Sequence, residues 1–218
     1  MCLAQAVPSG RVIGVDLERD SFAAARCPEA SIGLNNLAFT LADGRRLPFG
    51  TRRSTTFFAT LCSKRVGDPA SVVSELRRVT RRGVVVGAAS VEYGGIIIAG
   101  ERTAGPRRFY DIRQQLWRAE GIAEPNMGRR LRGLFQEAGF GRVEAFADYI
   151  SYGTPDLVTA FARDRAEECR DQQLLAAVTR HEIASVEELV QLAAVWEAWG
   201  EDPGAFFAFA WCRVLAWP

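Results

Sequence analysis

The chain has 218 residues, of which 48% are hydrophobic, 24% are charged and 10% are aromatic. These proportions are those of a globular protein, and the length suits one domain with a sizeable core. Lys and Arg number 27 against 26 for Asp and Glu, so the formal net charge is only +1. This balance excludes a whole-protein field that would attract nucleic acid or an anionic membrane. No apolar run approaches the roughly 20 residues that a bilayer-spanning helix needs.

The cysteines and the first residues bear on the cellular compartment. Residues 1–8 lack the basic start of a secretory signal. The five cysteines are widely scattered and have neither disulfide-framework nor metal-ligand spacing, so we expect no metal site and a reducing, cytoplasmic environment. They are Cys2, Cys27, Cys62, Cys169 and Cys212.

Strand-like and helix-like segments alternate in the first part of the chain, which is typical of an α/β domain with a mostly parallel sheet. Residues 11–16 form a β-branched run that ends in Asp16. Residues 37–43 alternate in hydrophobicity and end in Asp43. A third strand, rich in threonine and phenylalanine, is predicted over residues 55–61.

Helices are predicted between these strands. A short helix of small residues is expected over 21–26, and Asp68 and Pro69 are residues that begin a helix well. That second helix carries one apolar stripe, formed by Val72, Val73, Leu76 and Val79. Residues 83–89 are nearly all apolar, as expected of a strand covered on both faces.

The remainder of the chain is predicted to be mainly helical, with two further strands. The capping box at 185–188 begins one helix of an insert that precedes the last strand. We see no repeat or linker, so one domain over residues 1–218 is the economical interpretation. The predicted elements are helices over 107–119 and 127–138 (closed by Gly139), a strand over 142–149, a helical insert over about 151–200 and a strand over 205–215.

Asp16 and Asp43 are the two candidate binding residues that the pattern itself supplies. In an open α/β sheet, ligands bind outside the carboxyl ends of the strands. A carboxylate at the end of an early strand is well placed to accept hydrogen bonds from ribose hydroxyls, and one on the next strand from an adenine amino group. The alternative is that each aspartate merely begins a turn or caps a helix. Both interpretations stand at this point.

Four segments, in order along the chain, resemble class I S-adenosylmethionine-dependent methyltransferases of the small-molecule type. Residues 10–18 (GRVIGVDLE) resemble that family's second motif, and residues 36–49 resemble its third, in which an acidic residue precedes Leu-Pro-Phe. Residues 67–79 are similar to the helix between its fourth and fifth strands. Residues 134–140 (LFQEAGF) are similar to the junction before its sixth strand.

The resemblance implies a Rossmann-like fold with helices on both faces of the sheet, and S-adenosylmethionine as the cofactor. It implies that Asp16 binds the ribose and that Leu17 packs on the adenine. Asp43 would bind the adenine amino group, with the Gly44 backbone beside it. Tyr93, in a Tyr-Gly-Gly sequence, is placed either to border the substrate or to form a plain turn. The expected acceptor is a small molecule, and no catalytic residue is identified.

The sequence also differs from the family pattern. The family's glycine-rich cofactor loop precedes the segment that residues 3–8 resemble, so we expect an N-terminally truncated domain without that motif. Residues 57–59 read Phe-Phe-Ala where the family has Phe-Asp-Ala, and residues 81–83 read Arg-Arg-Gly where it has Arg-Pro-Gly-Gly. A second hypothesis is therefore a catalytically silent methyltransferase-like protein or fragment that acts, if at all, as a binding partner.

Other features are weaker. A nicotinamide-dependent enzyme is disfavoured because the chain has no Gly-x-Gly-x-x-Gly sequence. His181 is the single histidine and has no accompanying nucleophile motif, so a structural or solvated role is favoured. The arginines of 107–118 and 129–132 are interpreted as charged helix faces rather than as a nucleic-acid surface.

Overall fold

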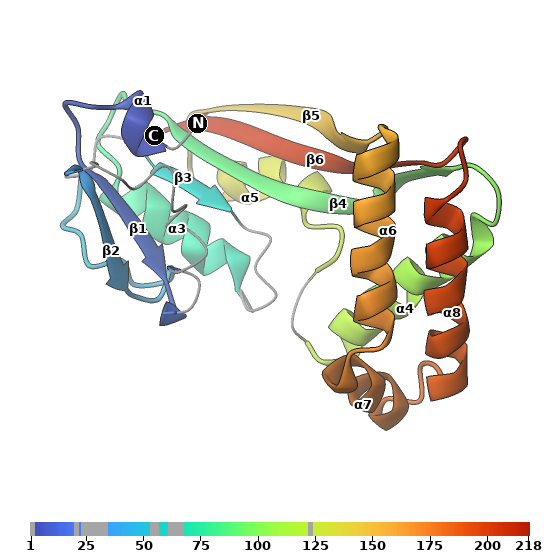
Figure 1. Cartoon of the computed structure of the whole chain (residues 1–218). Helices are drawn as coiled ribbons and strands as arrows, with labels where there is room; N and C mark the ends of the chain where they lie inside the picture. Colours follow the sequence, from blue (N-terminus) through green and yellow to red (C-terminus); the bar gives the residue numbers. More distant parts are fainter. Residues whose placement is uncertain (1–2, 20–21, 23–34, 53–56, 61–67, 122–123) are drawn as a thin grey trace.

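The structure is a computed structural model that describes residues 3–19, 22, 35–52, 57–60, 68–121 and 124–218. In this part of the chain, strands and helices alternate at first and helices then predominate (Figure 1). The elements are α1 (Leu3–Ala6), β1 (Val12–Asp16), β2 (Leu37–Leu41), β3 (Phe57–Thr60), α3 (Pro69–Val79), β4 (Val86–Ala99), α4 (Ala104–Ala119), η1 (Gly128–Arg130), α5 (Leu131–Glu137), β5 (Arg142–Tyr152), α6 (Pro155–Cys169), α7 (Gln172–Arg180), α8 (Val186–Gly200) and β6 (Phe206–Trp217).

The described strands form two sheets. β1 and β2 pair in parallel, and a second sheet has the order β3-β4-β6-β5. Within it β3 and β4 are parallel, whereas β6 is antiparallel to both of its neighbours. In Figure 1 the long strands of this second sheet connect the part that holds β1, β2 and α3 with the part that holds α4, α6, α7 and α8.

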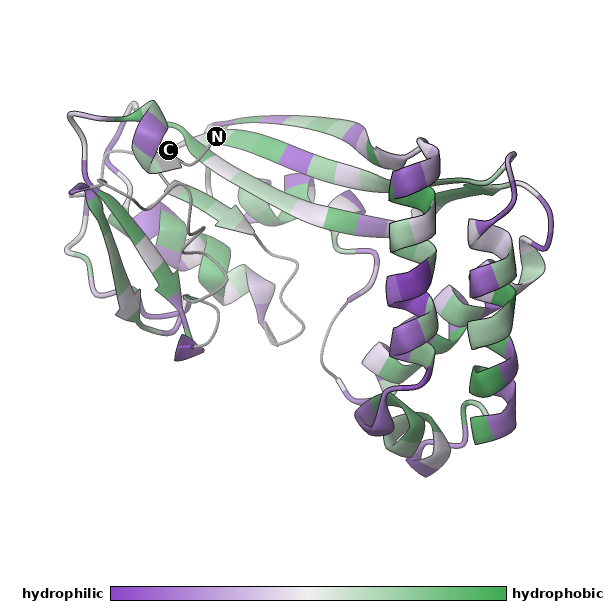
Figure 2. Ribbon diagram, viewed as in Figure 1, coloured by the Kyte–Doolittle hydropathy of each residue, from purple (hydrophilic) through white to green (hydrophobic). Residues whose placement is uncertain are grey.

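Strand β6 separates two hydrophobic clusters on opposite faces of the sheet. Phe207 is fully buried in a cluster with α4, α6 and α8, where Trp196 and Trp199 are also fully buried. Val214 and Ala216 lie in a second cluster with α3 and α5. Because successive side chains of a strand alternate between faces, Phe207 and Val214 point to opposite sides. The predicted α/β class with helices on both faces is thereby confirmed, and Figure 2 shows the strands as mostly hydrophobic.

Most predicted elements are present with small shifts of their ends. The Asp68 carboxylate caps α3 by accepting from the Ser71 N–H at 3.1 Å, and the predicted apolar stripe of α3 is buried. Gly139 follows α5 with a φ of +84°, and the Phe140 N–H then donates to the Phe135 carbonyl, which is the expected C-terminal cap. The predicted helix over 21–26 lies outside the described residues, apart from Phe22, as do residues 55, 56 and 61 of the predicted third strand.

The bounds predicted for the strand over residues 83–89 were wrong, and the plain-turn alternative for Tyr93 is excluded. The strand begins at Val86 and runs to Ala99, so the Tyr93-Gly94-Gly95 segment lies inside β4 and is not a plain turn. Between Glu92 and Ile97 the pairing with β6 shifts register. A Cβ on Gly95 would lie 2.6 Å from the Cβ of Ala210, so glycine permits the close approach of the two strands there.

Two glycines of the α5 region should respond oppositely to alanine. Gly133→Ala lies within the helix in open space and should raise the free energy of unfolding by about 0.5–1 kcal/mol. Gly139→Ala should lower it by about 1 kcal/mol, because a φ of +84° strains any residue with a Cβ. Denaturant unfolding of both variants measures this difference, and equal signs would contradict the assigned cap.

Candidate functional site

Asp16 and Asp43 lie at the same edge of the β1–β2 sheet. Asp16 is the last residue of β1 and stands opposite Leu41, the last residue of β2. The Ala42 N–H donates to the Asp16 carbonyl at 3.0 Å, which continues the pairing to the position before Asp43. The parallel register thus brings the two predicted aspartates to the carboxyl ends of neighbouring strands. This is the edge at which open α/β sheets bind ligands.

The turn after β1 holds one oxygen of the Asp16 carboxylate. Its Oδ1 accepts from the Glu18 N–H at 2.9 Å, which fixes the turn after β1. Among the described residues, its Oδ2 has no hydrogen-bond partner. Leu17 follows with 56% of its surface exposed. A carboxylate oxygen and an apolar side chain therefore stand side by side at the strand end.

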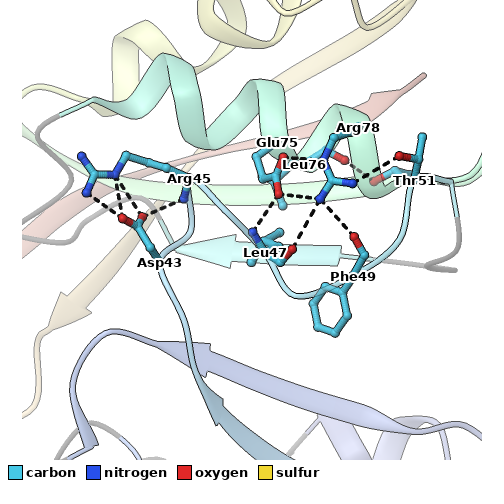
Figure 3. A network of polar contacts seen from close by, with 9 residues as sticks. Asp43, Arg45, Leu47, Phe49, Thr51, Glu75, Leu76 and Arg78 are labelled. Carbon is cyan, nitrogen blue, oxygen red and sulfur yellow. Dashed lines mark hydrogen bonds and ion pairs between the residues drawn. The ribbon is translucent and has the colours of Figure 1, made fainter.

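The Asp43 carboxylate is already bound within the chain. Arg45 donates from its backbone N–H to Oδ1 at 2.8 Å, and its guanidinium contacts both oxygens, the shortest distance being 2.6 Å from Nη2 to Oδ2 (Figure 3). These hydrogen bonds from Arg45 hold the pKa of Asp43 below its ordinary value. Both Arg45 and Asp43 remain partly exposed. An adenine amino group at this position would have to share the carboxylate with Arg45 or displace it.

Helix α3 fixes the segment that follows Asp43. Glu75 Oε1 accepts from the Leu47 N–H at 2.7 Å, and Arg78 donates to the Phe49 carbonyl at 3.0 Å (Figure 3). Arg78 and Glu75 also pair with each other at 2.6 Å. Gly44 packs toward the same helix, since a Cβ there would lie 3.5 Å from a methyl group of Val72. The strand end that carries Asp43 and Gly44 is therefore anchored on α3.

Tyr93 lies on β4, in the second sheet, within a group of aromatic rings. Its ring centroid is 4.8 Å from that of Trp117 and 5.9 Å from that of Tyr110, both on α4. Phe209 of β6 packs edge-on against it at 6.2 Å. The Tyr93 N–H donates to the Pro125 carbonyl at 3.2 Å, so the segment after α4 lies against this part of β4.

Beside Tyr93 is an ion pair that the sequence analysis missed, in which the acidic member is buried and the arginine is exposed. Glu92 is only 7% exposed, and its carboxylate accepts from the Arg129 backbone N–H at 3.0 Å and from its guanidinium at 2.5 Å. Next to it, the Gly94 N–H donates to Asn126 Oδ1 at 2.8 Å. The signal in the sequence was an acidic residue inside an otherwise apolar strand, which requires a cationic partner when buried.

Two other arginines of the groups 107–118 and 129–132 have acidic partners on neighbouring helices. Arg108 pairs with Glu188 of α8 at 2.7 Å, and Arg113 pairs with Glu168 of α6 at 3.0 Å. These contacts connect α4 to its neighbouring helices, which supports the interpretation as charged helix faces. No helix in the described part of the chain combines the length and apolar character that a membrane crossing requires.

The first 87 residues match the family described as a methyltransferase domain, so the match includes both Asp16 and Asp43. None of the curated proteins matches the sequence of the chain. The family similarity thus covers the N-terminal part of the chain. The matched residues 1–87 extend into β4, so they contain the whole β1–β2 edge.

Solved structures show the same fold at low sequence identity. The YcgJ protein of Bacillus subtilis superposes with a TM-score of 0.56 at 14% identity, over 98% of this chain and 86% of that one. Phosphoethanolamine N-methyltransferase 2 of Haemonchus contortus, in complex with phosphomonomethylethanolamine and S-adenosylhomocysteine, gives 0.52 at 16% identity. The match covers 99% of this chain but only 45% of that protein. The [4+2]-cyclase SpnF gives 0.51 at 15% identity, over 99% of this chain and 69% of its own.

Glu75→Gln should loosen the anchored segment after Asp43. Gln keeps an oxygen for the Leu47 N–H but loses the charged contact with Arg78, so we expect the free energy of unfolding to fall by about 1 kcal/mol at neutral pH. The hydrogen bond from Arg78 holds the pKa of Glu75 below its ordinary value of 4.5. The stabilisation is therefore present above pH 4.5 and disappears as the pH falls through the lowered pKa.

Chemical denaturation of wild type and Glu75→Gln across this pH range measures the effect. Glu197→Gln is the matched control, because it removes a charge from an exposed pair with Arg170 and should change stability little. A difference between Glu75→Gln and wild type that is no smaller in acid than at neutral pH would contradict the ionised pair.

Proposed function

We propose that this protein binds S-adenosylmethionine at the carboxyl edge of β1 and β2 and transfers its methyl group to a small-molecule acceptor. The observation that carries the proposal is the placement of Asp16 and Asp43 at the ends of two neighbouring parallel strands, inside the segment that matches the methyltransferase domain. The scattered cysteines further support a cytoplasmic location.

The residues at this edge fit the nucleoside part of the cofactor. Asp16 offers a carboxylate oxygen to the ribose hydroxyls, and the exposed Leu17 offers an apolar surface to the adenine ring. Asp43 and the Gly44 backbone then face the polar edge of the adenine. The cofactor supplies a sulfonium whose methyl group is already activated, so the protein mainly has to align an acceptor and exclude water.

We further propose that the acceptor lies near Tyr93. The aromatic rings around Tyr93 and the segment 124–129 give this part of β4 a surface that is both apolar and hydrogen-bonding. Small ligands favour such surfaces, in which a few polar groups fix the orientation. The Haemonchus contortus enzyme was solved in complex with phosphomonomethylethanolamine, which is a small phosphorylated amine. For this chain we propose only the class, a small molecule.

A second function is favoured by one specific contact. Because Arg45 occupies both oxygens of Asp43, the chain has an internal substitute for the adenine amino group. This favours a methyltransferase-fold protein that does not bind the donor and acts as a binding partner. The similarity to SpnF, a [4+2]-cyclase by name, also illustrates that this fold does not fix the reaction.

Isothermal titration with S-adenosylmethionine tests the proposed donor site. We expect Asp16→Ala to weaken binding by about 1–3 kcal/mol, roughly 5- to 150-fold, because buried ribose hydroxyls lose their charged acceptor. Asp43→Ala should also weaken it several-fold. Asp164→Ala is the matched control, since it removes an exposed carboxylate on α6. Wild-type protein that gives no heat of binding at high cofactor concentration would support the silent alternative.

Arg45→Ala separates the two functions more sharply. If Arg45 merely occupies Asp43 in the absence of a ligand, its removal should strengthen cofactor binding several-fold. In the Asp43→Ala background the same change should have no effect, because there is no carboxylate left to release. Weaker binding by Arg45→Ala alone would assign the guanidinium to the binding site itself.

A further inference from the structure

Strand β5 is an open edge of the four-stranded sheet. Among the described residues it pairs with β6 alone, and Figure 1 shows it as the outermost strand. The β5–β6 ladder runs without a register shift from Arg142, opposite Trp217, to Tyr152, opposite Phe207. Eleven consecutive residues therefore present their outward backbone groups in a regular row, which is a template for another strand.

The side chains of β5 do not protect this edge. From Ala145 to Ser151 every residue is exposed, so in this stretch neither face of the strand is covered. The exposed residues include Phe146 at 44%, Tyr149 at 51% and Ile150 at 44%. Proteins usually guard such an edge with charged side chains, above all lysine, with proline or with a bulge, and the charges of β5 include both signs. β5 contains neither proline nor lysine, and its ladder has no bulge.

We infer that β5 pairs with β5 of a second copy of this chain, antiparallel, about a two-fold axis perpendicular to the sheet. A two-fold axis in this direction maps each face of the sheet onto the same face of the partner's sheet. Residues that stand opposite each other across the axis therefore point to the same face. The three charged residues of β5, Arg142, Glu144 and Asp148, are at alternate positions and share one face. Their order along the strand then selects the register.

The favoured register places Ala145 opposite the partner's Ala145. Arg142 then stands opposite the partner's Asp148, and the same pair forms a second time across the axis. The next register, with Phe146 at the axis, would place Glu144 opposite the partner's Asp148, and like charges directly opposite destabilise a sheet. Within its own chain Arg142 pairs with Glu144, and Asp148 pairs with Arg213. The contacts between Arg142 and the partner's Asp148 would join these pairs into a row of alternating charges across the axis.

The same features favour a second copy over an unrelated protein. The charge pattern is complementary to itself, with the positive residue at one end of a seven-residue ladder and the negative residue at the other. Ala145 at the axis allows the two backbones to approach, and Val143 meets the partner's Ala147. Isologous contacts of this kind are the commonest in homodimers. The inference does not rest on the proposed methyl transfer, since it concerns a different edge of the molecule.

Two cysteine variants test the register. Residues directly opposite in an antiparallel pair have Cα atoms about 4.5–5.5 Å apart, which suits a disulfide, so Ala145→Cys should give a covalent dimer on mild oxidation. Ala147→Cys is the matched control, because the two introduced thiols would lie about 13 Å apart along the strands. The unmodified chain, with its own cysteines, sets the background. Equal cross-linking of the two variants, or none above background, overturns the register.

Two lysine variants test the interface itself by sedimentation across a concentration series. Wild type should sediment as a dimer, and Ala145→Lys should be a monomer, because two lysines would face each other at the axis. Ser151→Lys adds the same charge on the same exposed face but beyond the ladder, so it should remain a dimer. Circular dichroism checks that each variant is folded. A monomeric wild type, or a dimer that Ala145→Lys leaves intact, overturns the proposal.

Discussion

The long antiparallel pairing of β4 with β6 is the interaction on which the rest of the structure depends. β6 packs Phe207 against α4, α6 and α8 on one face and Val214 against α3 and α5 on the other. One strand therefore supports two cores, and β4 carries the same pairing from Val86 to Ala99. Because α3 in turn anchors the segment after Asp43, the position of the candidate donor site depends on this central pair of strands.

The elements that could be predicted from sequence are those whose signals are local. Asp68 before Pro69 begins α3, and Gly139 ends α5, because capping depends on residues within one turn. The end of β4 is different. Its second half contains Tyr93-Gly94-Gly95, which locally favours a turn, and it is a strand only because β6, far along the chain, pairs with it. No local pattern contains that information.

The candidate site divides in the same way. Asp16 and Asp43 were predicted together because parallel strands present their carboxyl ends at one edge, and the structure places them there. Their binding roles stay a prediction. The ion pair of Glu92 with Arg129 was missed because its members lie on β4 and η1 and are joined only by the fold. The contact of Arg45 with Asp43 was missed although it is local, since the spacing of two residues does not determine which side-chain conformation forms.

The Asp43–Arg45 contact does not by itself exclude a cofactor. More than half of the Arg45 side chain is exposed, so water screens the pair and competes for both partners. A bound adenine would exclude that water and offer its amino group as a donor. The contacts of Asp16 and Leu17 with the rest of the nucleoside would hold this donor in place, so its contact with Asp43 would need little further ordering. Arg45 can then return to solvent with little loss, because a flexible exposed side chain gives up little when its partner is taken. The contact is therefore one that a nucleoside can replace at little cost, and it is compatible with the donor site that we propose.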